Sequence, residues 1–186
     1  PEPAQFDDDG DRHAGPVVLW NHRWEHDKNP DAFLAALRAA RNGGARFRLA
    51  VCGQRFRAAP DAFHTIKTEF ADQIIHWGYL EDRAAYYALL ARAHIAVSTA
   101  HHEFFGLSML EATHFGARPL VPNRLSYPEL FPAVYRYDDA LAPQLISLCR
   151  GWESGRITLR DDRRAITSPH GAPCLDKWRA LLTTAI

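Results

Sequence analysis

Short apolar runs alternate with longer amphipathic segments along most of the chain. The apolar runs occupy residues 17–20, 47–52, 74–77, 94–98 and 119–121, and segments with apolar side chains at helical spacing occupy residues 31–41, 61–71, 82–93, 107–115 and 140–152. Short strands that alternate with helices of about ten residues are typical of right-handed βαβ units and a parallel sheet. Near-continuous apolar strands are expected where helices cover both faces of such a sheet. The pattern therefore predicts an α/β fold with a Rossmann-like, doubly wound parallel sheet.

The two ends of the chain depart from this alternation. Residues 1–15 are polar and acidic and open with Pro1 rather than Met, which is typical of an interdomain linker or of the end of a fragment. After Glu153 the pattern weakens, and a helical pattern resumes at residues 175–182. We therefore expect a single domain at residues 16–186, and we expect the chain to be part of a longer protein.

Composition narrows the class of protein. Hydrophobic residues make up 47% and charged residues 24% of the chain, as in a soluble globular domain. No apolar run approaches the roughly 20 residues needed to cross a bilayer, and no secretory signal opens the chain. The three widely separated cysteines suit a reducing compartment, so we expect a cytoplasmic protein. A net charge of zero argues weakly against a strongly basic nucleic-acid surface.

Two cations follow the first predicted strand. Ligands of doubly wound sheets bind beyond the carboxyl ends of the strands, and Arg23 and Lys28 lie there, just before a helix that Asn29 would cap. They are either solvated surface cations or parts of an anion site. A cation beside a helix N-terminus is unfavourable unless an anion is present, which favours a phosphate site. The dinucleotide and P-loop glycine patterns are both missing.

A metal site is not expected. His22 and His26 stand four residues apart, but they lie in a polar loop without an obvious third ligand.

The segment from Glu103 to Glu111 joins two carboxylates to the start of a predicted helix. Gly106 allows close backbone approach there, and the helix N-terminus offers free N–H donors for a phosphate. Carboxylates accept hydrogen bonds from sugar and ribose hydroxyls. Ser108 and Glu111 also match the S-x-x-E capping box, which needs no ligand, and spacing alone slightly favours that interpretation. Glu103 has no such structural explanation.

These residues carry a resemblance to a known family. Ser98-x4-Glu103-x2-Gly106-Leu107-x3-Glu111, followed by Gly116-Ala-Arg-Pro-Leu-Val121, resembles the E-x7-E signature of glycosyltransferase family 4, which has the GT-B architecture. The spacing of Arg23 and Lys28 and the position of Gly78 are also similar to that family. A narrower resemblance, to its tRNA-queuosine α-mannosyltransferase group, rests on His22–Lys28 and Pro122–Pro132. Phe104 departs from the family, which usually has glycine there.

The resemblance implies the C-terminal, donor-binding half of a retaining glycosyltransferase. It implies three partners: a nucleotide sugar, an N-terminal acceptor domain and, through that domain, tRNA. The expected donor is GDP-mannose, from which mannose would be transferred. Arg23 and Lys28 would bind the donor diphosphate in place of a metal ion, Glu103 the sugar and Glu111 the ribose. The other residues expected to bind the donor are Gly53, Gln54, Trp77, Gly78, Tyr79, Phe105, Gly106, Leu107 and Ser108.

Other functions remain open at this point. One is a non-catalytic nucleotide-binding or RNA-contacting module with the same fold, and others are a GT-B epimerase or a family 4 transferase with a lipid or small-sugar acceptor.

Overall fold

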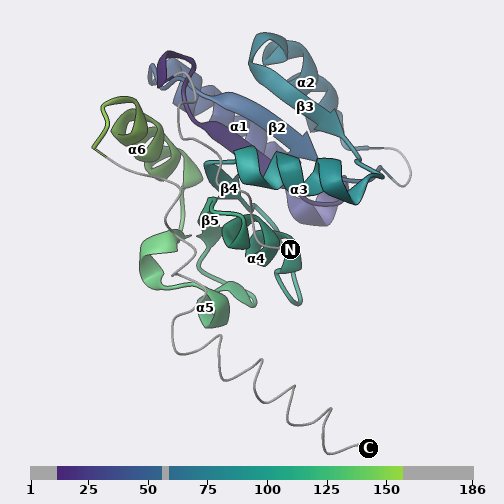
Figure 1. Ribbon diagram of the computed structural model, residues 1–186. Helices are drawn as coiled ribbons and strands as arrows, with labels where there is room; N and C mark the ends of the chain where they lie inside the picture. Colours follow the sequence, from purple (N-terminus) through teal and green to yellow (C-terminus); the bar gives the residue numbers. More distant parts are fainter. Residues whose placement is uncertain (1–11, 56–58, 157–186) are drawn as a thin grey trace, which may run out of the picture.

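The computed structural model describes residues 12–55 and 59–156, which form a twisted parallel sheet with helices on both faces (Figure 1). Within these residues the sheet has six strands in the order β3-β2-β1-β4-β5-β6. Every neighbouring pair is parallel. The strands are β1 Val17–Asn21, β2 Arg48–Cys52, β3 Ile74–Gly78, β4 Ile95–Val97, β5 Arg118–Pro122 and β6 Arg136–Tyr137. The predicted doubly wound α/β fold is confirmed.

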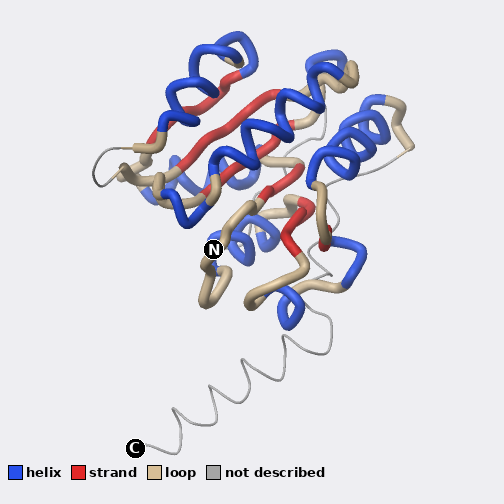
Figure 2. The backbone as a smooth tube through the Cα atoms, turned by 180° about the vertical axis from the view of Figure 1, so that it is seen from behind, coloured by secondary structure: helices blue, strands red, loops and turns tan. Residues whose placement is uncertain are grey.

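The helices divide between the two faces of the sheet (Figure 2). They are α1 Pro30–Asn42, α2 Asp61–Glu69, α3 Arg83–Arg92, α4 Leu107–His114, α5 Tyr127–Leu130 and α6 Leu141–Glu153, with short 3-10 turns η1 Arg12–Ala14, η2 His26–Lys28, η3 Ala71–Gln73 and η4 Ala133–Tyr135. Side chains of α1, α2 and α6 pack in one core layer, and those of α3 and α4 pack in the other. None of the helices in the described ranges is long and apolar enough to span a bilayer.

Strand β1 anchors both layers because all five of its residues are buried. Trp20 faces the α1 and α2 side, where its ring stacks on Phe33 and meets Phe63 edge to face. A buried indole N–H needs an acceptor, and Trp20 Nε1 finds one in Thr99 Oγ1 at 3.2 Å. Leu19 points into the opposite layer. The apolar run that predicted this strand therefore serves two cores.

Several elements differ from the sequence prediction. Helix α2 ends at Glu69 and the chain continues as η3, and the short elements α5, η4 and β6 were not predicted. Elements of two to four residues are too short to show a hydrophobic period, so the pattern carries no signal for them. The predicted helix at 175–182 and most of the predicted linker at 1–15 lie outside the described residues.

The order of the strands creates a crevice at the carboxyl edge of the sheet. Strand β1 pairs with β2 on one side and β4 on the other, so the connections from β1 and β4 leave in opposite directions. This is the switch point at which doubly wound sheets bind ligands. The loops that follow β1 and β4 carry Arg23, Lys28 and Glu103, the residues expected to act in catalysis.

Candidate functional site

A cavity of about 540 Å³ opens at this switch point. Its walls come from the loops that follow β1, β2, β3 and β4, and from α3 and the first turns of α4. Most of the residues predicted to bind the donor line it, namely Arg23, Lys28, Gly53, Gln54, Tyr79, Glu103, Phe105, Ser108 and Glu111. The size suits a drug-sized or nucleotide-sized ligand.

Trp77 is not part of this lining, in contrast to the prediction from sequence. Its ring packs edge to face against Trp24, with centroids 5.0 Å apart, and against Phe63. Trp77 thus packs with Trp24 and with Phe63 of α2 in one aromatic cluster. Gly78, which follows it, accepts a backbone hydrogen bond from the N–H of Gly53 at 3.2 Å. Both residues shape the end of the sheet, and neither contacts the cavity.

Hydrogen bonds join the loops after β1 and β4 across the switch point. Thr99 Oγ1 donates to the Lys28 carbonyl at 2.8 Å, and the His101 N–H donates to the Asp27 carbonyl at 2.7 Å. Thr99 also accepts from Trp20 in the core, so one hydroxyl ties the strand to both loops. These bonds hold the two halves of the site at a fixed separation.

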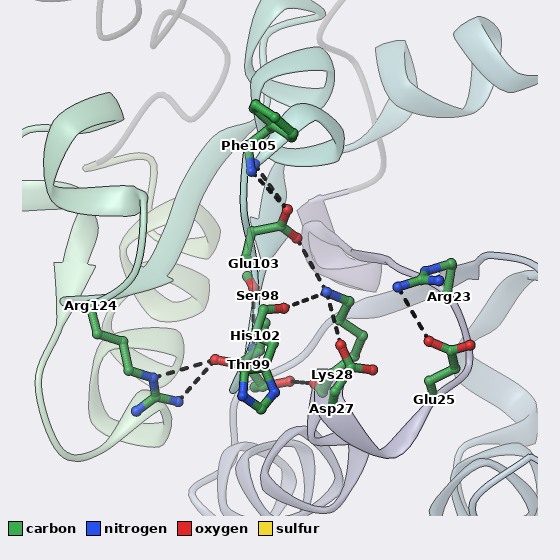
Figure 3. Close-up of polar contacts among 12 residues, drawn as sticks. Arg23, Glu25, Asp27, Lys28, Ser98, Thr99, His102, Glu103, Phe105 and Arg124 are labelled. Carbon is green, nitrogen blue, oxygen red and sulfur yellow. Dashed lines mark hydrogen bonds and ion pairs between the residues drawn. The ribbon is translucent and has the colours of Figure 1, made fainter.

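Lys28 lies inside the site rather than on the surface. Its side chain is 8% exposed at the end of η2, and its ammonium group faces the loop after β4 (Figure 3). Nζ donates to the His102 carbonyl at 2.5 Å and contacts Glu103 Oε2 at 3.5 Å and Asp27 Oδ2 at 3.3 Å. A lysine this buried needs partners of opposite charge, and these carboxylates supply them.

Arg23 is arranged differently from Lys28. Its side chain is 56% exposed at the mouth of the cavity and pairs with Glu25 at 3.3 Å (Figure 3). A surface ion pair of this kind is weak, so the guanidinium group is free to turn toward an anion in the cavity.

Glu103 bridges the cation and the start of α4. Oε1 accepts hydrogen bonds from the N–H groups of Phe105 at 3.3 Å and Gly106 at 3.0 Å, while Oε2 faces Lys28 (Figure 3). Burial raises the pKa of Glu103, but the bonds from Gly106 and Phe105 and the charge of Lys28 outweigh it and leave the pKa below its usual range. Glu103 therefore has the structural role that the sequence did not suggest. The Gly106 N–H is already bonded, so it is not among the free donors expected at the start of this helix.

The capping-box interpretation of Glu111 is wrong. Helix α4 begins at Leu107 with Gly106 as its N-cap at φ +65°, and no side chain caps it. Glu111 instead accepts a hydrogen bond from the Tyr86 hydroxyl at 2.7 Å. Tyr86 in turn accepts from Asn21 Nδ2 at 2.8 Å. A chain of polar groups thus links the end of β1, helix α3 and helix α4 along the wall of the cavity.

Two backbone donors remain open at the head of α4. Within the described parts of the chain, the N–H groups of Leu107 and Ser108 have no hydrogen-bond acceptor. Unpaired N–H groups are normal in the first turn of a helix and form an anion-binding site with its dipole. Of these two residues Ser108 lines the cavity, whereas Leu107 does not and its side chain is exposed.

His22 and Tyr86 are polar residues of the cavity that sequence reasoning did not assign to it. His22 is buried, and its ring lies edge to face on Trp20 at 5.0 Å. Burial, together with the nearby charge of Lys28, lowers the pKa of His22 to about 4. Tyr86 lies on a helix whose weak periodicity gave no hint of a polar contact. Both side chains line the cavity.

The described residues contain no group of three His, Cys, Asp or Glu side chains that could hold a metal ion. The His22 and His26 pair accordingly has no third ligand there. Metal independence of the reaction stays a prediction.

Comparison with known proteins places these features in a family. Residues 2–133 match the family described as Glycosyl transferases group 1. The chain belongs to this family. A curated relative, the tRNA-queuosine alpha-mannosyltransferase of Drosophila melanogaster, is 38% identical over 135 residues, which are 72% of this chain and 36% of that protein. The chain thus spans about a third of the length of this relative, and both resemblances drawn from the sequence are confirmed.

Solved structures of glycosyltransferases share the fold of this group 1 domain. The C-terminal domain of the glycosyl transferase group 1 family protein LpcC from Francisella tularensis superposes with a TM-score of 0.64 at 17% identity, covering 88% of this chain and 86% of that one. The pneumococcal O-GlcNAc transferase GtfA, in complex with UDP and GlcNAc, superposes with a TM-score of 0.68 at 14% identity, covering 90% of this chain and 35% of that one.

Proposed function

We propose that this chain is the donor-binding half of a retaining, metal-independent glycosyltransferase that moves mannose from GDP-mannose to queuosine in tRNA. The observation that carries the proposal is the contact between the Lys28 ammonium group and Glu103 at 3.5 Å, in a cavity that Ser108 of the first turn of α4 also lines. Groups that bind phosphate and groups that bind hydroxyls are thereby held side by side. A nucleotide sugar requires that combination.

The diphosphate fits the end of the cavity where the positive groups converge. Lys28 contacts the carboxylates of Asp27 and Glu103 at 3.3 and 3.5 Å. Charge-assisted hydrogen bonds are usually shorter than this, so a phosphate oxygen can replace either contact with a stronger one. Arg23 can swing from Glu25 onto the same phosphates, and the N–H groups of Leu107 and Ser108 supply two further donors. These four groups stabilise the charge that develops as the nucleoside diphosphate leaves. Each preorganised donor of this kind contributes about 3 to 4 kcal/mol to a transition state.

The two carboxylates divide the hydroxyl groups of the donor between them. Glu103 is fixed next to Lys28, so it suits a hydroxyl of the sugar that is attached to the diphosphate. Glu111 is held by Tyr86 on the α3 side of the cavity, which suits the ribose. Gln54 and Tyr79 follow the neighbouring strands and line the remaining space, where the base would lie. Retention of configuration and independence from metal are carried over from the family resemblance.

The acceptor side of the proposal rests on the Drosophila relative, whose name specifies tRNA queuosine as the acceptor. That protein is longer than this chain, and in the two-domain architecture of the family an N-terminal domain would supply the acceptor site. We expect the donor half alone to bind the nucleotide sugar and to transfer nothing. We also propose a cytoplasmic location, which the three widely separated cysteines favour.

Calorimetric titration of the chain with GDP-mannose, GDP and UDP-glucose tests the donor assignment. We expect binding of GDP-mannose and GDP, and weaker binding of UDP-glucose. Arg23→Ala should weaken the binding of GDP. Arg46→Ala is the matched control, because Arg46 is 55% exposed, pairs with Glu153 at 3.4 Å and lies at the opposite end of β2. If the wild-type chain binds none of the three compounds, the proposed function is refuted.

Transfer itself is tested in the complete enzyme with queuosine-containing tRNA, with a lipid extract as the alternative acceptor. Glu103→Gln keeps an oxygen for the N–H groups of Phe105 and Gly106 but removes the charge that faces Lys28. We expect this variant to fold and to lose most of its mannosyl transfer. Unchanged transfer would instead support a non-catalytic role for the site.

A further inference from the structure

Phe104 exposes an aromatic ring at the mouth of the cavity. The residue is 85% exposed, which is the largest fraction among the exposed large hydrophobic residues that the structure describes, and it lines the cavity. Phe105 and Leu107 in the same turn are 72% and 63% exposed. Apolar side chains that gather on the surface in this way mark a place where a ligand or partner binds.

The ring lies at the end of the cavity that an acceptor must reach. Phe104 directly follows Glu103, whose carboxylate faces Lys28 at 3.5 Å where the sugar and the diphosphate of the donor are proposed to lie. The donor base is proposed to lie elsewhere in the cavity, near Gln54 and Tyr79. An acceptor hydroxyl that attacks the sugar therefore arrives beside Phe104.

An arginine without a carboxylate partner lies on the same edge of the sheet. Arg124 follows β5, is exposed, and donates from Nε and Nη2 to the Ala100 carbonyl at 3.4 and 3.1 Å, on the loop that leads to Phe104. In Figure 3, Arg124 and Arg23 lie on either side of Glu103. Arg124 forms no ion pair within the described ranges, so its other N–H groups are available to an anion such as phosphate.

A flat apolar face beside a cation suits an unpaired nucleobase and its phosphate. Enzymes that modify a base take it out of its stack, and an aromatic or apolar side chain then replaces the lost neighbour. Unpaired RNA is recognised by such stacking together with cations on its backbone. A stable protein interface would cover roughly 800 Å² on each partner, whereas the large apolar side chains exposed on this loop are confined to residues 104–107.

We infer that Phe104 is a specificity-determining residue that stacks on the unpaired base of an RNA acceptor, while Arg124 binds a neighbouring phosphate. The inference rests on the proposed function, because it assigns the acceptor side of the same site. The ring contributes to the binding of RNA and not to the binding of the donor.

Steady-state transfer from GDP-mannose to queuosine-containing tRNA by the complete enzyme separates these two contributions. Phe104→Leu keeps an apolar side chain but removes the flat face, whereas Phe104→Trp keeps the flat face. We expect Phe104→Leu to raise the KM for tRNA about tenfold, which corresponds to about 1.4 kcal/mol, and to change the KM for GDP-mannose less than about twofold. Phe104→Trp should keep both values within about twofold of the wild type.

The pair of substitutions also distinguishes RNA from a protein partner. Leucine would serve nearly as well as phenylalanine against an apolar protein surface, so a normal KM for tRNA in Phe104→Leu would overturn the inference. Equal losses in Phe104→Leu and Phe104→Trp would overturn it too, as would a rise in the KM for GDP-mannose. Val134→Ala is the control, because Val134 is 66% exposed and lies outside the cavity lining. Circular dichroism spectra verify that each variant is folded.

Salt dependence tests the phosphate contact. Arg124→Gln keeps an N–H group for the Ala100 carbonyl but removes the charge, so it should raise the KM for tRNA and lower the slope of log KM against log salt concentration by about 0.7. Arg46→Ala should leave that slope unchanged. An unchanged slope in Arg124→Gln would overturn the role of Arg124.

Failure of the inference can be told apart from failure of the proposed function. If the wild-type enzyme mannosylates tRNA and Phe104→Leu does so equally well, the stacking contact is wrong and the proposed function stands. If the wild-type enzyme binds GDP-mannose but transfers nothing to tRNA, the proposed acceptor is wrong and the stacking contact falls with it.

Discussion

Removal of the Tyr86 hydroxyl should destabilise the fold and loosen the nucleotide site together. In Tyr86→Phe the Asn21 side-chain amide loses the acceptor that it meets at 2.8 Å, and Glu111 loses the donor at 2.7 Å. Asn21 is 7% exposed, so its N–H has little access to water. Burial of the Tyr86 hydroxyl, with its bond to Glu111, also raises the pKa of Tyr86 far above its usual value, so the group acts as a neutral donor at all working pH values.

The magnitude follows from which partner stays buried. A buried donor without an acceptor costs about 1 to 3 kcal/mol, whereas the more exposed Glu111 carboxylate can bind water and adds little. We therefore expect a loss of about 2 kcal/mol in the free energy of unfolding. For a chain of this length that corresponds to a fall of about 4 to 8 °C in the melting temperature.

Urea unfolding measures this loss as a lower midpoint at an unchanged slope. Tyr87→Phe is the matched control, because Tyr87 is the next residue on α3, is also partly buried and stacks its ring on Phe115. Its loss should stay within about 0.5 kcal/mol. Titration with GDP should show weaker binding to Tyr86→Phe, since Glu111 is then free to turn. Equal stability of the two variants would refute the view that the Asn21–Tyr86–Glu111 chain is a preformed part of the site.

Three other positions give measurable effects on stability. The pKa of Glu103 is lower in the folded chain than in the unfolded chain, where it is about 4.3, so the stability that its charge contributes is complete above that pH and is lost as pH falls through the folded pKa. The difference in unfolding free energy between the wild type and Glu103→Gln should therefore shrink below about pH 4.3. A difference that stays constant would contradict this. Gly53→Ala should cost more than about 3 kcal/mol, since its Cβ would lie 1.8 Å from the His22 carbonyl oxygen, while Gly44→Ala, which meets nothing within 4 Å, should cost only about 1 to 2 kcal/mol of left-handed strain. Asn29→Ala should lower the free energy of unfolding by about 1 to 3 kcal/mol, because it removes the side-chain oxygen that accepts from the Ala32 N–H at 3.3 Å and places alanine in a left-handed conformation, at φ +51°. An unchanged melting temperature would show that Asn29 does not cap the helix.

The fold was predictable because its strands are short, buried and regularly separated. Residues 17–20 and 94–98 contain the buried runs that became β1 and β4, and Asn29 correctly marked the start of α1. The family motif then placed Arg23, Lys28 and Glu103 at one edge of the sheet. Periodicity and position after a strand are local properties, so a sequence displays them directly.

Side-chain partners at the site were less predictable. Glu111 matched a capping box, but its carboxylate turned to Tyr86 on another helix, and Glu103 took two N–H groups of its own turn. Trp77 follows the pattern of a strand end that lines a pocket, yet Trp24 and Phe63 attract its ring into the core. His22 became notable only through the depth of its burial. The contacts of Glu111 and Trp77 depend on residues far away in the chain, which spacing along the sequence does not encode. The contact of Glu103 is local, but it depends on the turn that the backbone makes before α4.

The placement of β1 between β2 and β4 also governs when the site can exist during folding. Lys28 and Glu103 are 75 positions apart, and they meet only after β4 has docked on β1. Such long-range parallel pairing closes a large loop and forms slowly compared with a hairpin. A chain that has collapsed around β1 and β2 alone has no cavity for a nucleotide. The rate at which donor binding appears during refolding would therefore report the rate at which β4 docks on β1.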